Sequence, residues 1–282
     1  MAFANALPVL YGLSAAATWG AADFAGGVAA KRANEFKVVL VAHASSLIFV
    51  TAMAWFSREP IPPFSAHLWG GLSGIAGGAG VACLYRALAI AKMGTVAPIT
   101  GLLTAALPVI VGGITQGRPR TVQIFGFCMA LLAIVLIAKP DEFHGKPKGL
   151  GLAMTAGLCF GLFIVFLRQA GTVSIFWPLV SSRVASTVLM LAIVLALPGA
   201  RKAGTSTMPI VTAVVCGVLD SIGNLLLVLA TRSGRLDVAA VLSSLYPAAT
   251  VILAYVILKE RVSRIQNVGI VAALAAVPMI AG

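Results

Sequence analysis

The sequence predicts an all-α membrane protein with ten transmembrane helices, arranged as two inverted five-helix repeats. Of its 282 residues, 60% are hydrophobic and only 10% are charged, whereas soluble domains are about one quarter charged. The mean hydropathy is +1.03. Apolar segments of about 20 residues, the length that a helix needs to cross a bilayer, follow one another along the chain.

Ten segments are apolar enough to be predicted as spans. They are residues 8–30, 37–56, 67–91, 95–115, 121–138, 149–170, 176–197, 208–231, 237–258 and 264–281. The connections between them are too short to fold as a soluble domain, so any function must reside in the membrane helices. No charged residue precedes Asp23, so the charged start of a signal peptide is missing and we expect the first segment to be retained.

The charge distribution points to lipid as a partner and excludes nucleic acid. The chain has 20 Lys and Arg against 8 Asp and Glu, a formal charge of +12. The basic residues occur in small groups between apolar runs, such as Lys31-Arg32 and Arg201-Lys202, as is typical of the ends of membrane spans. No basic stripe interleaved with aromatic residues occurs. The four cysteines form no CxxC pair and lack metal-ligand spacing, so we expect no metal and no cofactor.

The two halves of the chain share an ordered set of matches. These are Gly12-Leu13 with Gly151-Leu152, His43 with Arg183, Val96-Ala97 with Val238-Ala239, and Gln123–Gly126 with Gln266–Gly269. The set divides the chain into a first repeat (1–138), a connecting loop (139–148) and a second repeat (149–282). Because five spans are an odd number, the second repeat must enter the membrane from the opposite side. Transporters built in this way bind substrate between the repeats, near the membrane midplane.

Several of these residues resemble a known family. Trp19-Gly20, the run 238–247, and Glu260-Arg261 followed by Gln266 and Gly269 are similar to the motifs of EamA-type permeases of the drug/metabolite transporter superfamily. Lys259 stands where the family has Gly, and in the first half Gly117 stands where it has Glu. The resemblance implies export or exchange of small metabolites, amino acids or drugs through a central cavity formed by both halves.

Asp220 is the strongest candidate functional residue, because it lies in the middle of the span 208–231. At 1.5 Å per residue it is roughly 16–18 Å from either end, and a charge at the centre of a span costs at least about 2.5–3.5 kcal/mol. Asn224 follows one turn later on the same helix face. We interpret the pair as a proton or cation site, with a structural hydrogen bond to a neighbouring helix as the alternative.

Asp23 lies towards the end of the first span, one turn after Trp19. The expected helix directions place His43 and Arg86 in the same leaflet, so a structural ion pair of Asp23 with either residue is one interpretation. A functional carboxylate is the other. His43 has a side chain that titrates near neutral pH, and a hydrogen bond between helices is its alternative role.

Arg86 and Arg183 lie close enough to span ends to reach lipid headgroups, or they contact an anionic group of a solute. Tyr85, Tyr246 and Trp19 are candidates to line a cavity and stack on ligands, with ordinary packing as the alternative. Three prolines, Pro98, Pro108 and Pro247, each remove a backbone hydrogen bond within a span. Such breaks are tolerated beside a cavity, so we interpret the fourth and ninth spans as gate helices.

The even number of spans places both termini on one face, and two arguments about that face conflict. The loops on the terminal side carry six Lys and Arg, and those on the other side carry twelve. The positive-inside rule therefore places the termini outside. The family resemblance implies cytoplasmic termini, and this is the orientation that we adopt.

Together these features predict a secondary transporter that exports or exchanges a small metabolite, amino acid or drug-like solute by alternating access, with proton coupling through Asp220 or Asp23. The sequence has no GxxxxGK[ST] loop for direct ATP use. A channel or a non-transporting membrane subunit is the main alternative. An intramembrane enzyme is a weaker one, since neither HExxH nor GxSxG is present.

Overall fold

The computed structural model describes residues 2–91, 93–137, 149–198, 209–259 and 263–281, which form helices and short connections with no β-strand. The first half contains α1 (Ala2–Ala30), α2 (Glu35–Ser57), α3 (Phe64–Ile90), α4 (Met93–Thr115) and α5 (Thr121–Ile137). The second half contains α6 (Leu150–Ala170), α7 (Phe176–Ala196), α9 (Ile210–Ser233), α10 (Leu236–Ser243), α11 (Tyr246–Leu258) and α12 (Arg264–Ala281). The predicted loop 139–148 and the motif Glu260-Arg261 lie outside the described residues.

The helices have the length and composition of membrane spans. Seven segments are long and apolar enough to cross a bilayer, with α10 and α11 counted as one, and two shorter apolar helices lie at Ile99–Thr115 and Thr121–Ile137. Large apolar side chains cover the outer surface, among them Trp55 and Phe56, which are 76% and 77% exposed. The chain is therefore a multi-pass membrane protein. The count of ten spans and the domain boundaries stay predictions.

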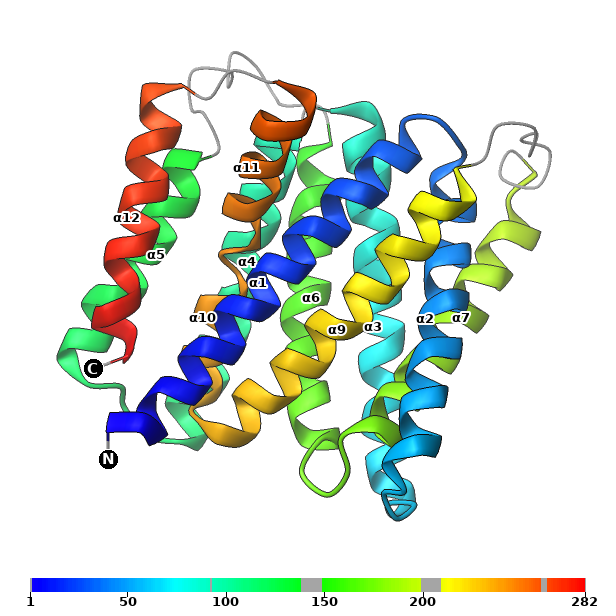
Figure 1. Ribbon diagram of the computed structural model, residues 1–282, viewed down its shortest axis with the longest axis horizontal. Coiled ribbons are helices and arrows are strands. Elements are labelled where there is room, and N and C mark those ends of the chain that lie inside the picture. The colour runs from blue at the N-terminus through cyan, green and yellow to red at the C-terminus, as the bar shows by residue number, and fades with distance from the viewer. Residues whose placement is uncertain (1, 92, 138–148, 199–208, 260–262, 282) are drawn as a thin grey trace.

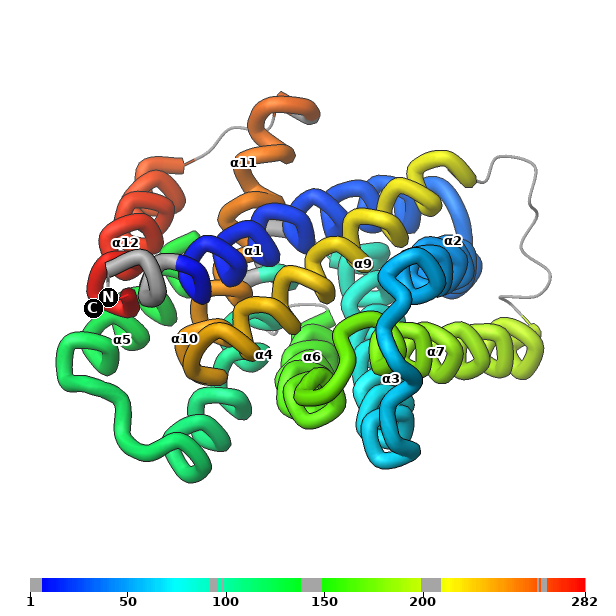
Figure 2. Tube along the Cα trace, turned by 60° about the horizontal axis from the view of Figure 1, so that its bottom comes forward, coloured from blue at the N-terminus to red at the C-terminus, as the bar shows by residue number. Residues whose placement is uncertain are grey.

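The two halves of the chain interlock. Among the described residues, each extensive helix contact joins a helix of one half to a helix of the other: α1 lies along α9, α3 along α6, α2 against α7 and α5 against α12. Figures 1 and 2 show α1 beside α9 and α5 beside α12. The pairs α1–α9 and α6–α3 exchange places when the halves are exchanged, as a two-fold repeat requires.

Glycines allow the backbones of the two halves to touch. A Cβ on Gly74 of α3 would lie 2.0 Å from the carbonyl oxygen of Ser182 on α7. The equivalent contact is made by Gly217 of α9, where a Cβ would lie 2.0 Å from the carbonyl oxygen of Ala42 on α2. Since any side chain at these two positions would force the helices apart, glycine sets the close helix separation at both crossings.

The ninth predicted span is interrupted. α10 ends at Ser243, and α11 begins at Tyr246 with Pro247 in its first turn. Proline has no backbone N–H and cannot continue the hydrogen bonding of the preceding helix, which favours a break at this point. In the first half, α4 continues through both Pro98 and Pro108 without interruption. The two halves therefore differ at the helices that we interpreted as gates.

One end of the bundle holds the start of α1 and the end of α12 (Figure 1), and we call it the terminal end. At this end, Glu59 of the first half caps α7 of the second. Its Oε2 atom accepts hydrogen bonds from the Ser174 hydroxyl at 2.7 Å and from the backbone N–H groups of Ile175 and Phe176 at 3.0 and 3.1 Å. A carboxylate at a helix N-terminus is also favoured by the helix dipole.

A second contact between the halves at the terminal end is centred on Arg235. Its guanidinium donates to the carbonyl oxygens of Gln116 and Gly117 at 3.1 and 2.7 Å, while the Leu236 N–H donates to the Gln116 side chain at 2.7 Å. Hydrogen bonds to the Asp237 carboxylate raise the pKa of Arg235 above its ordinary value, so the cation persists. We refer to this contact and the Glu59 cap as the two latches.

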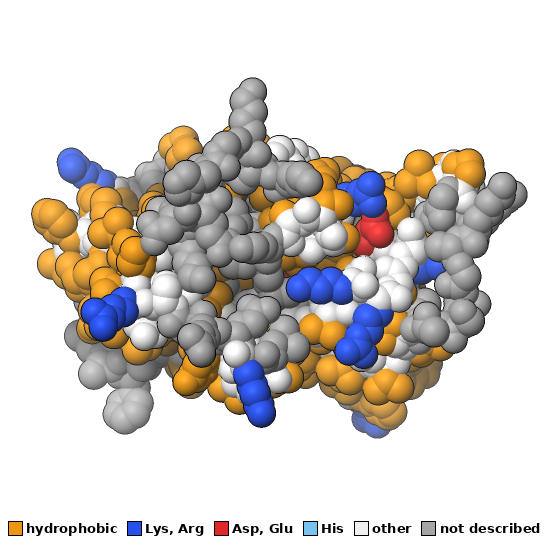
Figure 3. All heavy atoms as spheres, turned by 90° about the horizontal axis from the view of Figure 1, so that it is seen from above, with side chains coloured by type: hydrophobic (Ala, Val, Ile, Leu, Met, Phe, Trp, Pro, Cys, Tyr) orange, Lys and Arg blue, Asp and Glu red, His pale blue; other side chains and the backbone are white. Residues whose placement is uncertain are grey.

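The opposite end of the bundle carries an ion pair within the first half. The guanidinium Nη1 of Arg86 on α3 lies 2.7 Å from the Glu35 carboxylate at the start of α2. Figure 3 shows this end from above: basic side chains are spread over it, and hydrophobic side chains gather at its rim. The two latches and this ion pair thus lie at opposite ends of the bundle.

Candidate functional site

A cavity of about 50 Å³ lies among the central parts of the helices. A buried water needs roughly 10 to 15 Å³ on the same measure, so the cavity has room for several waters or a small solute. Both halves of the chain contribute to its wall, through α1, α3 and α4 of the first half and α6, α7, α9 and α11 of the second. The lining residues are Trp19, Asp23, Gly74, Gly77, Gly78, Val81, Thr104, Phe160, Phe163, Ile164, Ser182, Arg183, Asp220, Asn224 and Tyr246.

Arg183 and Asp220 form an ion pair in the wall of this cavity. The Nη2 atom of Arg183 on α7 lies 2.5 Å from Oδ2 of Asp220 on α9, and the side chains are 6% and 22% exposed. Each charge compensates the other in the membrane interior, where an unpaired charge is costly. The pair explains how the sequence tolerates Asp220 in the middle of a span.

A chain of hydrogen bonds extends from this ion pair to α1. The side-chain amide of Asn224 donates to Asp220 Oδ2 at 3.3 Å, and the indole N–H of Trp19 donates to Asn224 Oδ1 at 3.1 Å. The shared helix face predicted for Asp220 and Asn224 is therefore present in the structure. Because Trp19 belongs to the first half, the chain of hydrogen bonds connects the two repeats across the cavity.

Asp23 also faces the cavity, one turn beyond Trp19 on α1. It makes no hydrogen bond or ion pair with any described residue, although Asp220 lies within electrostatic range. Tyr246 of α11 lies close by, with its hydroxyl near Thr104 but without a hydrogen bond of regular geometry between them. The cavity thus contains two carboxylates and a single guanidinium among its lining residues.

Aromatic rings and glycines shape the rest of the wall. The ring centroids of Trp19 and Phe163 are 6.3 Å apart, with an interplanar angle of 58°. On α3, a Cβ at Gly77 would lie 3.0 Å from the Phe163 ring, and one at Gly80 would lie 2.6 Å from the ring of Phe160. The glycines of α3 therefore make room for two rings of α6.

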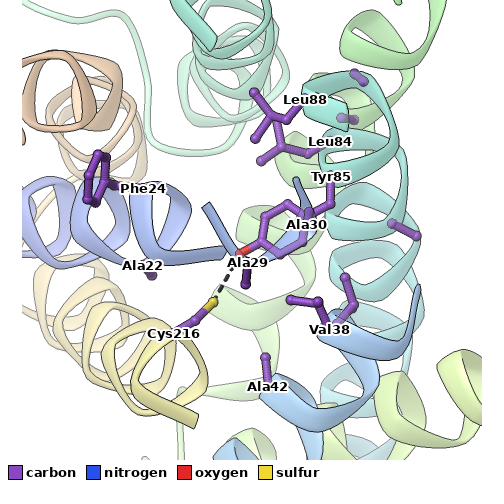
Figure 4. Packing of buried hydrophobic residues seen from close by; sticks show 14 of the residues in the cluster. Ala22, Phe24, Ala29, Ala30, Val38, Ala42, Leu84, Tyr85, Leu88 and Cys216 are labelled. Carbon is purple, nitrogen blue, oxygen red and sulfur yellow. Dashed lines mark hydrogen bonds between the residues drawn. The ribbon is translucent and has the colours of Figure 1, made fainter. Parts of the chain in front are cut away.

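Tyr85 is not among the residues that line the cavity. Its hydroxyl and the Cys216 sulfur form a hydrogen bond of 3.0 Å inside a buried apolar cluster (Figure 4). A Cβ on Gly26 would lie 1.9 Å from this hydroxyl, so Tyr85 occupies the space that glycine leaves on α1. This geometry fits the packing alternative for Tyr85.

His43 and Arg86 do not pair with Asp23. Arg86 binds Glu35 at the end of the bundle. His43 is 2% exposed and lies within electrostatic range of Arg183, near the backbone of Ser186, with no hydrogen-bond partner for Nδ1 among the described residues. Of the nine predicted pathway residues, the structure brings together Trp19, Asp23, Arg183, Asp220, Asn224 and Tyr246.

Sequence reasoning missed the contribution of α6 and α4 to the cavity. Phe160, Phe163 and Thr104 carry no charge and look like ordinary membrane residues. In the structure Phe160-Gly161 is the counterpart of Trp19-Gly20, a register that differs from the match of Gly12-Leu13 with Gly151-Leu152. A Cβ on Gly20 would meet the Tyr246 carbonyl oxygen of α11, and one on Gly161 would lie near that of Thr104 on α4.

The described residues contain no cluster of three or more His, Cys, Asp or Glu side chains that could hold a metal ion. The functional groups among the cavity-lining residues include two carboxylates, a guanidinium, an amide and aromatic rings.

The sequence matches the EamA-like transporter family twice, over residues 6–139 and 147–282. The chain belongs to the EamA-like transporter family. One solved structure, named only "Crystal structure of protein", is similar to it in fold, with a TM-score of 0.74 and 18% sequence identity, and the match covers 96% of this chain and 95% of that one. No curated protein matches the sequence. The chain is thus an EamA-family membrane transporter with two repeats.

Two departures from the EamA family pattern lie at helix ends where the backbone has a positive φ. Lys259, where the family has Gly, ends α11 in the left-handed conformation with φ 53°, and glycine is the residue that most readily adopts this conformation. Gly117, where the family has Glu, has φ +80° and its carbonyl oxygen accepts a hydrogen bond from Arg235. The substituted positions thus lie at helix ends and not in the cavity.

Proposed function

We propose that this EamA-family protein is a secondary transporter that exports or exchanges a small solute by alternating access, and that Asp23 and Asp220 couple transport to protons. The observation that carries the proposal is the central cavity, which both repeats line and which contains the Arg183–Asp220 pair and the carboxylate of Asp23, a group that makes no ion pair with any described residue. Intramembrane ionisable groups facing such a cavity are typical of coupling sites.

The proposed coupling uses the proximity of the two carboxylates. Binding of a proton or a cation at one carboxylate changes the electrostatic environment of the other. The guanidinium Nη2 of Arg183 can bind another group only after its ion pair with Asp220 breaks. The titratable and charged groups near the two carboxylates are Arg183 on α7, Tyr85 on α3, Tyr246 on α11 and Cys216 on α9. Solute and proton would thus compete for the same small set of groups.

The interlocked helices favour gates over rocking of whole repeats. A rigid rotation of one repeat against the other would have to break most of the helix contacts, since these join the two halves. The latches at the terminal end and the break between α10 and α11 are local and involve few contacts. We therefore propose that opening of the latches, with bending at the break, gives access from the terminal end.

Transport into proteoliposomes tests the proposal. Purified protein is assayed with a panel of radiolabelled amino acids, amines and organic acids, with an imposed pH gradient. We expect saturable uptake and counterflow of at least one solute, which distinguishes a carrier from a channel. Asp220→Asn is expected to change the pH dependence of uptake, whereas Glu35→Gln, which alters a carboxylate outside the cavity, is not. An unchanged pH response in Asp220→Asn would remove this residue from the coupling mechanism.

A further inference from the structure

We propose that the cavity recognises a compact organic cation, such as a protonated or quaternary amine, in preference to neutral or anionic solutes. This inference rests on the proposed transport function and names its substrate class. Three observations carry it: the charges that the cavity exposes, the aromatic rings of its wall and its size.

The carboxylates of the cavity are more exposed than its guanidinium, which favours binding of a cation. The Arg183 side chain is 6% exposed and its guanidinium is held by Asp220, whereas the Asp220 side chain is 22% exposed and Asp23 is partly exposed. Asp23 makes no ion pair with a described residue. A solute entering the cavity therefore meets two carboxylates, one of which makes no ion pair with a described residue, and a guanidinium whose Nη2 atom is already held by Asp220.

The wall beside Asp23 is aromatic. Trp19 precedes Asp23 by one turn, Phe163 lies against Trp19, and Tyr246 lies on the facing helix. The faces of such rings attract cations, with Trp the strongest, and the attraction grows when the cation is removed from water. A carboxylate that shares a cavity with aromatic rings can bind an alkylated ammonium group through both charge and apolar contact.

The size and charge of the cavity argue against the other solute classes. To bind Nη2 of Arg183, an anion would have to displace Asp220 from it, leaving a carboxylate without its cation in the membrane interior. The carboxylate of a zwitterion would have to displace Asp220 in the same way, while its ammonium group binds Asp23. A cation needs neither change, and a volume of about 50 Å³ limits it to a small head group.

Four probes of similar shape test the charge preference: choline, 3,3-dimethyl-1-butanol, 3,3-dimethylbutanoate and glycine betaine. They present a trimethylammonium or tert-butyl head with positive, neutral, negative or zwitterionic overall charge. Binding to the folded protein raises its thermal unfolding temperature in a concentration-dependent way. We expect choline to raise this temperature at concentrations at least about tenfold lower than the neutral alcohol, because the alcohol lacks both the ionic and the cation–π attraction.

Variants locate the binding. Asp23→Asn is expected to abolish the choline-induced shift, and Glu35→Gln, the matched carboxylate outside the cavity, is expected to retain it. Trp19→Phe, which keeps a ring but weakens the cation–π attraction, is expected to reduce the shift. An equal or larger response to the alcohol, the butanoate or the betaine, a choline shift that survives Asp23→Asn, or no shift with choline would overturn the cation assignment.

The failure of this inference is distinguishable from failure of the transport proposal. If choline gives no shift but a solute of another charge is taken up saturably in proteoliposomes, the substrate class is wrong and the carrier function stands. If no member of the transport panel shows saturable uptake or counterflow, the transport proposal itself fails.

Discussion

Gln123 and Gln266 make reciprocal hydrogen bonds across the pair α5 and α12. The side-chain amide of Gln123, at the start of α5, donates to the carbonyl oxygen of Ile280 at 3.2 Å, and that of Gln266, at the start of α12, donates to the carbonyl oxygen of Ile137 at 3.2 Å. The two helices are therefore antiparallel. This exchange of equivalent bonds is a direct sign of inversion in the last helix of each repeat.

Replacing either glutamine by alanine is expected to destabilise the protein by a similar amount. Each change leaves a buried helix-end carbonyl without its donor, and a lost hydrogen bond of this kind costs about 1 kcal/mol. The measurement is the unfolding midpoint of Gln123→Ala and Gln266→Ala in denaturant or detergent titration. A loss confined to one of the two variants would contradict the equivalence of the bonds.

Gly74→Ala is expected to be strongly destabilising, because the new Cβ would lie 2.0 Å from the Ser182 carbonyl oxygen. Neither backbone can yield without moving a whole helix, so the cost is expected at about 1–3 kcal/mol or more, as for overpacking. Gly71→Ala, three residues earlier on the same helix, is the matched control, since its Cβ would meet nothing within 4 Å. Equal unfolding temperatures for the two variants would rule out the close crossing of α3 and α7.

The Arg183–Asp220 pair is expected to show strong energetic coupling. Asp220→Asn or Arg183→Gln alone leaves one buried charge uncompensated, at a cost of about 3–5 kcal/mol. The double variant removes both charges and is expected to lose much less than the sum of the single losses. A double-mutant cycle of unfolding free energies measures this difference, and additive losses would mean that the two side chains do not interact.

The Glu59 latch is expected to hold the terminal end closed. Glu59→Ala removes the hydrogen bonds that cap α7, and loss of a cap costs about 0.5–2 kcal/mol. In a background free of native cysteines, Ser182→Cys in the cavity wall reports access through its rate of modification by a water-soluble thiol reagent. We expect Glu59→Ala to raise this rate and Glu35→Gln to leave it unchanged. The same rate in both would show that Glu59 does not control access.

The lengths of the helices were predictable because the length of an apolar run is set by the bilayer. The missing N–H of proline predicted the break before Pro247, but the same reasoning applied to Pro98 and Pro108, through which α4 continues. The pairing of the helices was not, because nearly every face of these helices is apolar and the sequence does not distinguish faces that meet lipid from faces that meet protein. The close crossings became identifiable only when Gly74 and Gly217 were placed against the backbones that they contact.

The charged residues of the cavity could be predicted from the sequence only in part. Asp220 and Asn224 were identified by depth and by spacing along one helix, both of which are local. The partner of Asp220 was not, since Arg183 lies on another helix at a depth that also suits a contact with lipid headgroups. The role of Glu59 could not be predicted from the sequence, because an acidic residue in a loop is common. Its role as a cap depends on the position of the first turn of α7 in the folded protein.

The close crossings of α3 with α7 and of α9 with α2 also constrain how the molecule can move. At Gly74 and Gly217 the backbones meet with no layer of side chains between them, so no rotamer change can absorb a sliding displacement there. Sliding of the helices is therefore resisted at these two crossings, and we expect the movement that opens the cavity to take place at the break between α10 and α11.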